Sequence, residues 1–122
     1  MDSKITIDII NNINILYLEG LFTGSQDGSD ELSLTLGQLI GRREKKIALN
    51  FEKVKLFTSQ AIGSIVKSHN ELITYDGRII VFNLPKFIKS GFEIIKLNAI
   101  IPIFDNFEEV QAFFDKSLKS ND

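Results

Sequence analysis

The hydrophobic periodicity changes from segment to segment, and the order of these changes constrains the fold more than any other feature. Isoleucines at alternate positions of 5–9 are separated by polar residues, which is typical of a half-buried strand. Asn11-Asn12 is a turn signal, and 13–18 predicts a second strand that ends at Gly20. The chain therefore begins with an antiparallel hairpin.

After a polar loop over 23–29, helix-like and strand-like apolar patterns alternate to the end of the chain. The predicted elements are a helix over 30–40 capped by Ser29, a strand over 47–51, a helix from Thr58 or Ser59 to Asp76-Gly77, a strand over 79–82, a helix over 87–95, a strand over 100–104 and a helix over 106–118. We expect residues 1–118 to form one α/β domain, with a mixed sheet and four main helices, and 119–122 to form a polar tail.

Composition and charge exclude several classes of protein. With 122 residues, 43% of them apolar and 25% charged, the chain has the make-up of one globular domain and not of a disordered one. The net charge is −2, and the basic residues cluster only at 42–46, where Glu44 interrupts them. Because a nucleic-acid binder needs a basic face, we expect no nucleic-acid partner.

The same sequence predicts a protein of the cytoplasm. It has no cysteine, so disulfides and thiolate chemistry are excluded, and it has no apolar run long enough to span a membrane. The first residues enter a strand directly and do not resemble a signal peptide.

Side chains typical of catalysis are scarce. His69 is the single histidine and falls on the predicted apolar stripe of its helix, formed by Ile62, Ile65, Val66, Leu72 and Ile73, so we interpret it as structural. The carboxylate pairs 30–31 and 108–109 lie in predicted first helical turns, where compensation of the helix dipole explains them. We therefore predict no catalytic residue, metal or cofactor, and no enzyme.

The segment 56–63 carries the most information about function. It places the hydroxyls of Thr58 and Ser59 at the start of a helix, directly after a strand. A helix N-terminus presents free N–H groups and a partial positive charge, so a phosphate on a serine there would be well held. Spacing alone favours an ordinary helix cap over a modification site, and the second interpretation stays open beside the first.

Four stretches, which cover 18–20, 49–51, 58–63 and 100–110, resemble the STAS domain of the bacterial anti-sigma-factor antagonist type, and the resemblance extends over nearly the whole chain. Members of this family carry a strand ending in Leu-Asn-Leu and, some seven residues on, an Asp-Ser-Ser/Thr-Gly-Leu-Gly turn that opens a helix. Here 49–51 reads Leu-Asn-Phe and 58–63 reads Thr-Ser-Gln-Ala-Ile-Gly at the same spacing. The Gly20 that follows Leu18-Glu19 and the stretch 100–110 also match.

The resemblance implies a binding protein that phosphorylation controls. It makes Ser59 the phosphate acceptor, with Thr58 as the secondary candidate, and it implies a partner serine kinase that doubles as an anti-sigma factor. A PP2C-type phosphatase would restore the unmodified form. We expect the outer face of the helix to bind the partner, through Thr58, Ser59, Gln60, Gly63, Ser64 and Lys67.

The chain departs from the family pattern near the acceptor. Thr58 stands where the family has Asp, and Ala61 where it has Gly. The family's Gly-Glu-Leu-Asp reads Gly-Leu-Phe-Thr over 20–23, so both characteristic acids are absent. Two other interpretations are a constitutive STAS subunit of an ABC-type lipid transporter or signalling assembly, and a small-ligand or nucleotide-binding domain that uses the loop 24–28.

Overall fold

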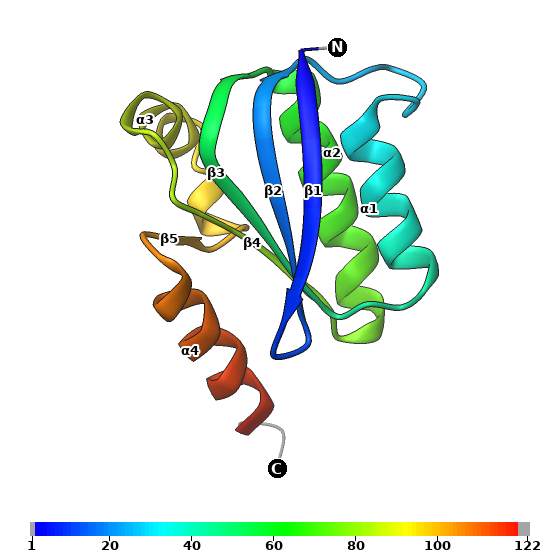
Figure 1. The fold of residues 1–122 in the computed structure, drawn as a ribbon, viewed down its shortest axis with the longest axis vertical. Coiled ribbons are helices and arrows are strands. Elements are labelled where there is room, and N and C mark those ends of the chain that lie inside the picture. Colours follow the sequence, from blue (N-terminus) through cyan, green and yellow to red (C-terminus); the bar gives the residue numbers. More distant parts are fainter. Residues whose placement is uncertain (1, 120–122) are drawn as a thin grey trace.

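Five strands form one mixed sheet in the order β1-β2-β3-β4-β5, in a computed structural model that describes residues 2–119, with side chains through residue 116 (Figure 1). The strands are β1 (Ser3–Ile10), β2 (Ile13–Phe22), β3 (Lys46–Phe57), β4 (Arg78–Phe82) and β5 (Ile103–Phe104). The first two pair antiparallel, and each later strand lies parallel to its neighbour. The predicted fold class, a hairpin followed by strand–helix units, is confirmed.

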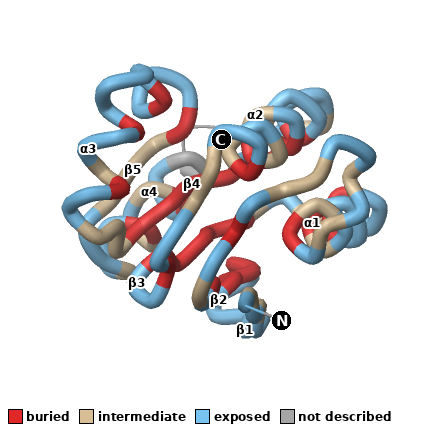
Figure 2. Tube along the Cα trace, turned by 90° about the horizontal axis from the view of Figure 1, so that it is seen from above, coloured by how far each residue is buried: buried red, intermediate tan, exposed pale blue. Residues whose placement is uncertain are grey.

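Helices cover both faces of this sheet (Figure 2). They are α1 (Glu31–Gly41), α2 (Ser59–Leu72), α3 (Lys86–Ile94) and α4 (Phe107–Lys119), with the short 3-10 helices η1 (Ile73–Tyr75) and η2 (Leu97–Ala99). Because strand side chains alternate between faces, Leu16 and Leu49 join the core under α1, α2 and α3, whereas Ile15 and Ala48 join α4. Apart from Lys119, which ends α4, the predicted tail lies outside the described residues.

The predicted turns are confirmed. Asn11 and Asn12 have φ of 53° and 68°, the left-handed pair that a two-residue type I′ hairpin requires. Asp76 has φ of 67°, and the Gly77 N–H donates to the Leu72 carbonyl at 2.8 Å, which closes α2. At the last helix, Asn106 Oδ1 accepts from the Glu109 N–H at 2.9 Å, as the predicted cap requires.

The central strands are longer than predicted, and the predicted ends at Gly20 and residue 51 are wrong. β2 and β3 stay paired as far as Phe22 opposite Phe57, across irregularities that shift the register near Glu19 and Gly20. Such shifts break the alternation of apolar and polar residues, so periodicity no longer marks the strand. As a result β3 leads into α2 with one residue between them.

Two further boundaries differ from the prediction. Asp30, and not Ser29, caps α1, because its Oδ2 accepts from the Ser33 N–H at 3.2 Å. The predicted strand over 100–104 shortens to β5, because the N–H groups of Ile100 and Ile101 donate back to the Leu97 carbonyl of η2, at 2.9 and 2.8 Å. Pro102 directly precedes β5 at the edge of the sheet, which is the position expected for a proline there.

The buried face of α2 is rotated from the predicted apolar stripe. Its buried residues are Ala61, Ile65, Ser68 and Leu72, whereas Ile73 is 45% exposed. Small side chains at Ala61 and Ser68 occupy the face toward the sheet, where they allow close packing. A search for large apolar residues passes over them, which explains the wrong helical phase.

His69 lies half-buried beside this face, and a variant tests its structural role. Burial, aided by the charge of Arg78, lowers the pKa of His69 below the ordinary 6.5. The unfolded chain therefore binds the proton more readily, and the free energy of unfolding should fall as the pH drops below about 6.5 toward the folded pKa. His69→Leu should show a flatter pH dependence, with equal or slightly higher stability at pH 7.5, in urea unfolding between pH 7.5 and 5.5. Equal slopes for both proteins would contradict this role.

Candidate functional site

Thr58 fixes the start of α2 against the end of β2. Its Oγ1 accepts from the Ala61 N–H at 3.3 Å and donates to the Thr23 carbonyl at 2.8 Å. Its own N–H donates to the Phe22 carbonyl at 3.0 Å. The ordinary cap weighed for this segment is therefore present at Thr58, whose hydroxyl is occupied as donor and as acceptor.

Ser59 is the first residue of α2, and it is exposed. Its hydroxyl makes no hydrogen bond to any of residues 2–116, whose side chains the structure describes. The first turn of α2 contains no acidic residue, and backbone N–H groups at the start of a helix have no partner within the helix. The two candidate acceptors thus differ: Ser59 offers a free hydroxyl at a positive helix end, and Thr58 does not.

Gly24 brings the loop between β2 and α1 against the first turn of α2. Its φ is +73°, and a Cβ there would lie 2.8 Å from the Ala61 nitrogen and 2.9 Å from the Gln60 carbonyl carbon. Only a residue without a side chain permits this approach. The sequence marked Gly24 as a loop residue but gave no sign of this contact.

A chain of hydrogen bonds joins this loop to α1 and α2. Asp30 Oδ1 accepts from the hydroxyls of Ser25 at 2.8 Å and Ser33 at 2.7 Å. The Ser64 hydroxyl lies 2.8 Å from that of Ser33 and donates to it, since the Ser33 proton is already used. Burial raises the pKa of Asp30, but the bonds from Ser33 and Ser25 together outweigh it and hold the pKa below its usual value.

Ser64 corrects one expectation about the outer face of α2. It is half-buried and faces α1, whereas the sequence placed it on the open surface. The rotated phase of α2 is the reason. The predicted phase implied that a tryptophan at Ser64 would leave the stability unchanged. In the structure it would press against α1, so it should lower the stability.

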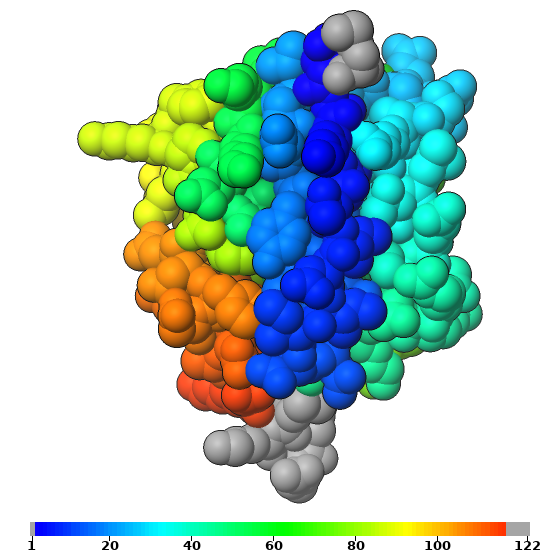
Figure 3. Space-filling model, in the orientation of Figure 1, coloured from blue at the N-terminus to red at the C-terminus, as the bar shows by residue number. Residues whose placement is uncertain are grey.

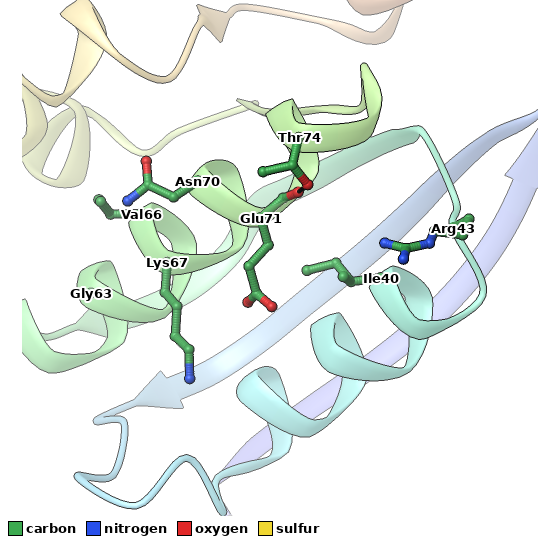
Figure 4. Close-up of a pocket in the computed structure, with 8 residues that line it drawn as sticks. All are labelled: Ile40, Arg43, Gly63, Val66, Lys67, Asn70, Glu71 and Thr74. Carbon is green, nitrogen blue, oxygen red and sulfur yellow. Dashed lines mark hydrogen bonds between the residues drawn. The ribbon is translucent and has the colours of Figure 1, made fainter.

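The predicted partner-binding residues therefore divide between two sides of α2. Gln60, Ser64 and Lys67 line a polar groove between α1 and α2, of about 650 Å³. Figure 4 shows an adjoining pocket that shares Ile40, Gly63, Lys67 and Glu71 with this groove, and in it Lys67 and Glu71 extend from α2 toward α1. Gly63 is exposed, and a Cβ there would meet nothing within 4 Å.

Ser59 borders a second, apolar groove between α2 and α3. This groove measures about 280 Å³, and three of its side chains are well exposed: Leu56 at 43%, Phe87 at 61% and Ile95 at 55%. Its other lining residues are Phe57, Ile62, Ile88, Gly91 and Phe92. Sequence analysis missed this surface. The available signal was the excess of apolar residues over 87–95, more than one buried stripe can use.

Known proteins show the same fold. No family model matches the chain. BtrV of Bordetella bronchiseptica, provisionally assigned as an anti-sigma factor antagonist, is 21% identical over 115 residues, which are 94% of this chain and 97% of BtrV. An anti-sigma factor antagonist from Mycobacterium paratuberculosis superposes with a TM-score of 0.77 at 9% identity, over 90% of this chain and 92% of the other. Phosphorylated SpoIIAA of Bacillus superposes with a TM-score of 0.67 at 16% identity, over 90% of this chain and 99% of SpoIIAA.

The chain therefore has the STAS fold of the anti-sigma-factor antagonists, and the resemblance read from the sequence is confirmed. Within residues 2–119 no helix is both long and apolar enough to cross a membrane. The described residues also contain no cluster of three or more His, Asp or Glu that could hold a metal ion.

Two glycine variants test the contact between the loop and α2. Gly24 and Gly28 both have left-handed backbones, with φ of +73° and +74°, but a Cβ at Gly28 would meet nothing within 4 Å. Gly28→Ala should cost about 1–2 kcal/mol of unfolding free energy through the backbone alone. Gly24→Ala adds a collision with α2, so urea unfolding should show a loss at least about 1 kcal/mol larger. Equal losses would contradict the contact.

Proposed function

We propose that this chain is an anti-sigma-factor antagonist that binds its partner through the surface around Ser59 and releases it on phosphorylation of that residue. The partner is an anti-sigma factor that is also a serine kinase, and a PP2C-type phosphatase reverses the modification. The chain itself is a regulator without catalytic activity, and it works in the cytoplasm. The observation that carries the proposal is the free Ser59 hydroxyl at the rim of the apolar groove.

The apolar groove supplies the attraction in the unmodified state. Burying exposed apolar surface contributes roughly 25 cal/mol per Å², and Leu56, Phe87 and Ile95 are large exposed side chains in the lining of the groove. Gly63, on the outer face of α2, allows a partner to approach the helix closely. Specificity would come from the polar groups of the first turn of α2.

Phosphorylation would oppose docking without disturbing the fold. It adds a charge of about −1.5 to −2 beside the groove, and an apolar partner surface cannot solvate that charge. The free N–H groups at the start of α2 are suited to receive the phosphate, so the domain can stay folded. In support, SpoIIAA in its phosphorylated form superposes on this chain over 90% of its length.

Two of the departures from the family pattern, at Thr58 and Thr23, lie in contact with each other. Thr58, in the place of the family Asp, donates its hydroxyl to the carbonyl of Thr23, which replaces the second acid. Because Thr58 and Thr23 are neutral, a phosphate on Ser59 does not meet the repulsion that the two family carboxylates would exert on it. They also remove negative charges that a kinase could read, so recognition by the partner would depend more on the apolar groove.

Phosphate transfer is the first test. Incubation of the full chain with the partner kinase and ATP should add one phosphate, which mass spectrometry should place on Ser59, and Ser59→Ala should abolish it. Thr58→Ala is the control: it should lower stability by about 1 kcal/mol through loss of the cap, yet still accept phosphate. Phosphate on Thr58, or on neither residue with the true partner, would contradict the proposal.

Two matched variants test the docking surface. Phe87 and Leu34 are exposed to similar degrees, 61% and 55%, but Phe87 borders the groove and Leu34 lies on α1. Phe87→Asp should weaken partner binding at least about tenfold in calorimetric titration, because it places a charge in an apolar contact. Leu34→Asp should bind normally. Equal effects of the two variants would place the interface elsewhere.

A further inference from the structure

β1 leaves one edge of the sheet open along eight residues. It is the first strand in the sheet order, and in Figure 2 no other segment of the described residues 2–119 lies beyond it. The two-residue turn makes Ile10 and Ile13 a hydrogen-bonded pair, so that every second residue back from Ile10 bonds to β2. The backbone groups of Ser3, Ile5, Ile7 and Ile9 therefore point outward. A strand edge with free N–H and C=O groups can receive a further strand.

The side chains along this edge are also open to a partner. Ile7 is 42% exposed and Ile9 is 61% exposed, on the face toward α1. Lys4, Thr6 and Asp8 are exposed on the opposite face. Figure 3 shows β1 as a dark blue band that runs uncovered down the face of the molecule.

The charges on this strand are arranged symmetrically. Lys4 and Asp8 lie two residues on either side of Thr6. When two such strands run antiparallel with Thr6 opposite Thr6, each Lys4 faces the Asp8 of the other strand. Ile5 then faces Ile7, and both have outward-pointing backbone groups, so they form a hydrogen-bonded pair. Lys4 and Asp8 fall in a non-hydrogen-bonded pair, where side chains approach most closely.

We propose that two copies of this chain associate through β1, antiparallel about Thr6, and join their sheets into one. The contact is isologous, because the same surface serves both copies. Two other registers are excluded by charge: pairing about Lys4 sets Lys4 against itself, and pairing about Asp8 sets Asp8 against itself. Pairing about Ile5 sets Asp8 against the exposed Asp2. Pairing about Ile7 sets Asp8 against Thr6 and Lys4 against Ile10, so neither charge meets an opposite one, and it is less favourable than pairing about Thr6. The partner is thus a second copy in one defined register.

Asp8 has a second role at the edge of the single chain. Its Oδ1 accepts from the Ile9 N–H at 2.8 Å, which occupies one outward donor. In the paired state the carboxylate turns to Lys4 of the second copy, and the Ile9 N–H becomes available to Ser3 of that copy. Charges on an edge strand oppose pairing with unrelated strands, and here they favour one self-complementary register.

This association is independent of the proposed function. β1 contains none of the residues that line the apolar groove beside Ser59. Failure of the phosphorylation switch would leave the dimer unaffected, and the reverse also holds.

Cysteine cross-linking tests the register, because the chain has no cysteine of its own. Thr6→Cys lies on the two-fold axis, where facing residues are about 4.5 Å apart between Cα atoms, close enough for a disulfide. Mild oxidation of the full chain should give a covalent dimer. Tyr17→Cys, on β2 opposite Thr6, is the matched control: it leaves the β1 contact intact but lies one strand away from it, so it should give no covalent dimer. If Thr6→Cys cross-links no faster than Tyr17→Cys, the proposal is overturned.

A charge swap tests the same register without a cross-link. Lys4→Glu sets a glutamate against the Asp8 of the other copy at both ends of the paired strands. The dissociation constant of the dimer, measured by sedimentation, should therefore rise about tenfold. The double variant Lys4→Glu/Asp8→Lys should restore wild-type association. A wild-type chain that stays monomeric throughout, or a double variant as weak as the single one, would overturn the proposal.

Discussion

The hydrogen bonds of Thr58 to the end of β2 determine where α2 begins, and the candidate site depends on that position. Through them the first turn of α2 is fixed to the Phe22 and Thr23 carbonyls, while Gly24 lets the following loop close over the same turn. The hydroxyl of Thr58 is used to form this cap, so the cap needs nothing from Ser59, which is exposed. One residue thus serves the fold, and its neighbour is available for regulation.

The architecture could be predicted because its signals are local. The left-handed pair Asn11-Asn12, the stop at Asp76 and the cap at Asn106 each depend on a few neighbouring residues, and they fall where expected. The site could be predicted only in part. The proposed acceptor, Ser59, rests on resemblance to a family. The contact of Gly24 with Ala61 joins residues distant in sequence, so no local pattern indicates it.

The errors share a physical cause, which is that size and pairing outweigh hydropathy. Ser68 and Ala61 lie on the buried face of α2 because small residues fit there, so the apolar stripe misplaced Ser64 by part of a turn. β2 and β3 extend through register shifts that erase alternation. The apolar groove arises from side chains of β3, α2 and α3 that meet only in the folded domain. Surfaces assembled from several elements are therefore the hardest features to predict from sequence.

We propose that a partner docks on the apolar groove and the first turn of α2, and that a phosphate on Ser59 prevents this docking. Amide chemical shifts of the isotope-labelled chain, followed while the unlabelled anti-sigma factor is added, test this claim most directly. The largest changes should fall on residues 56–63 and 87–95, and the phosphorylated chain should show none at the same partner concentration. Changes confined to the groove between α1 and α2, or equal changes in the phosphorylated chain, would contradict it.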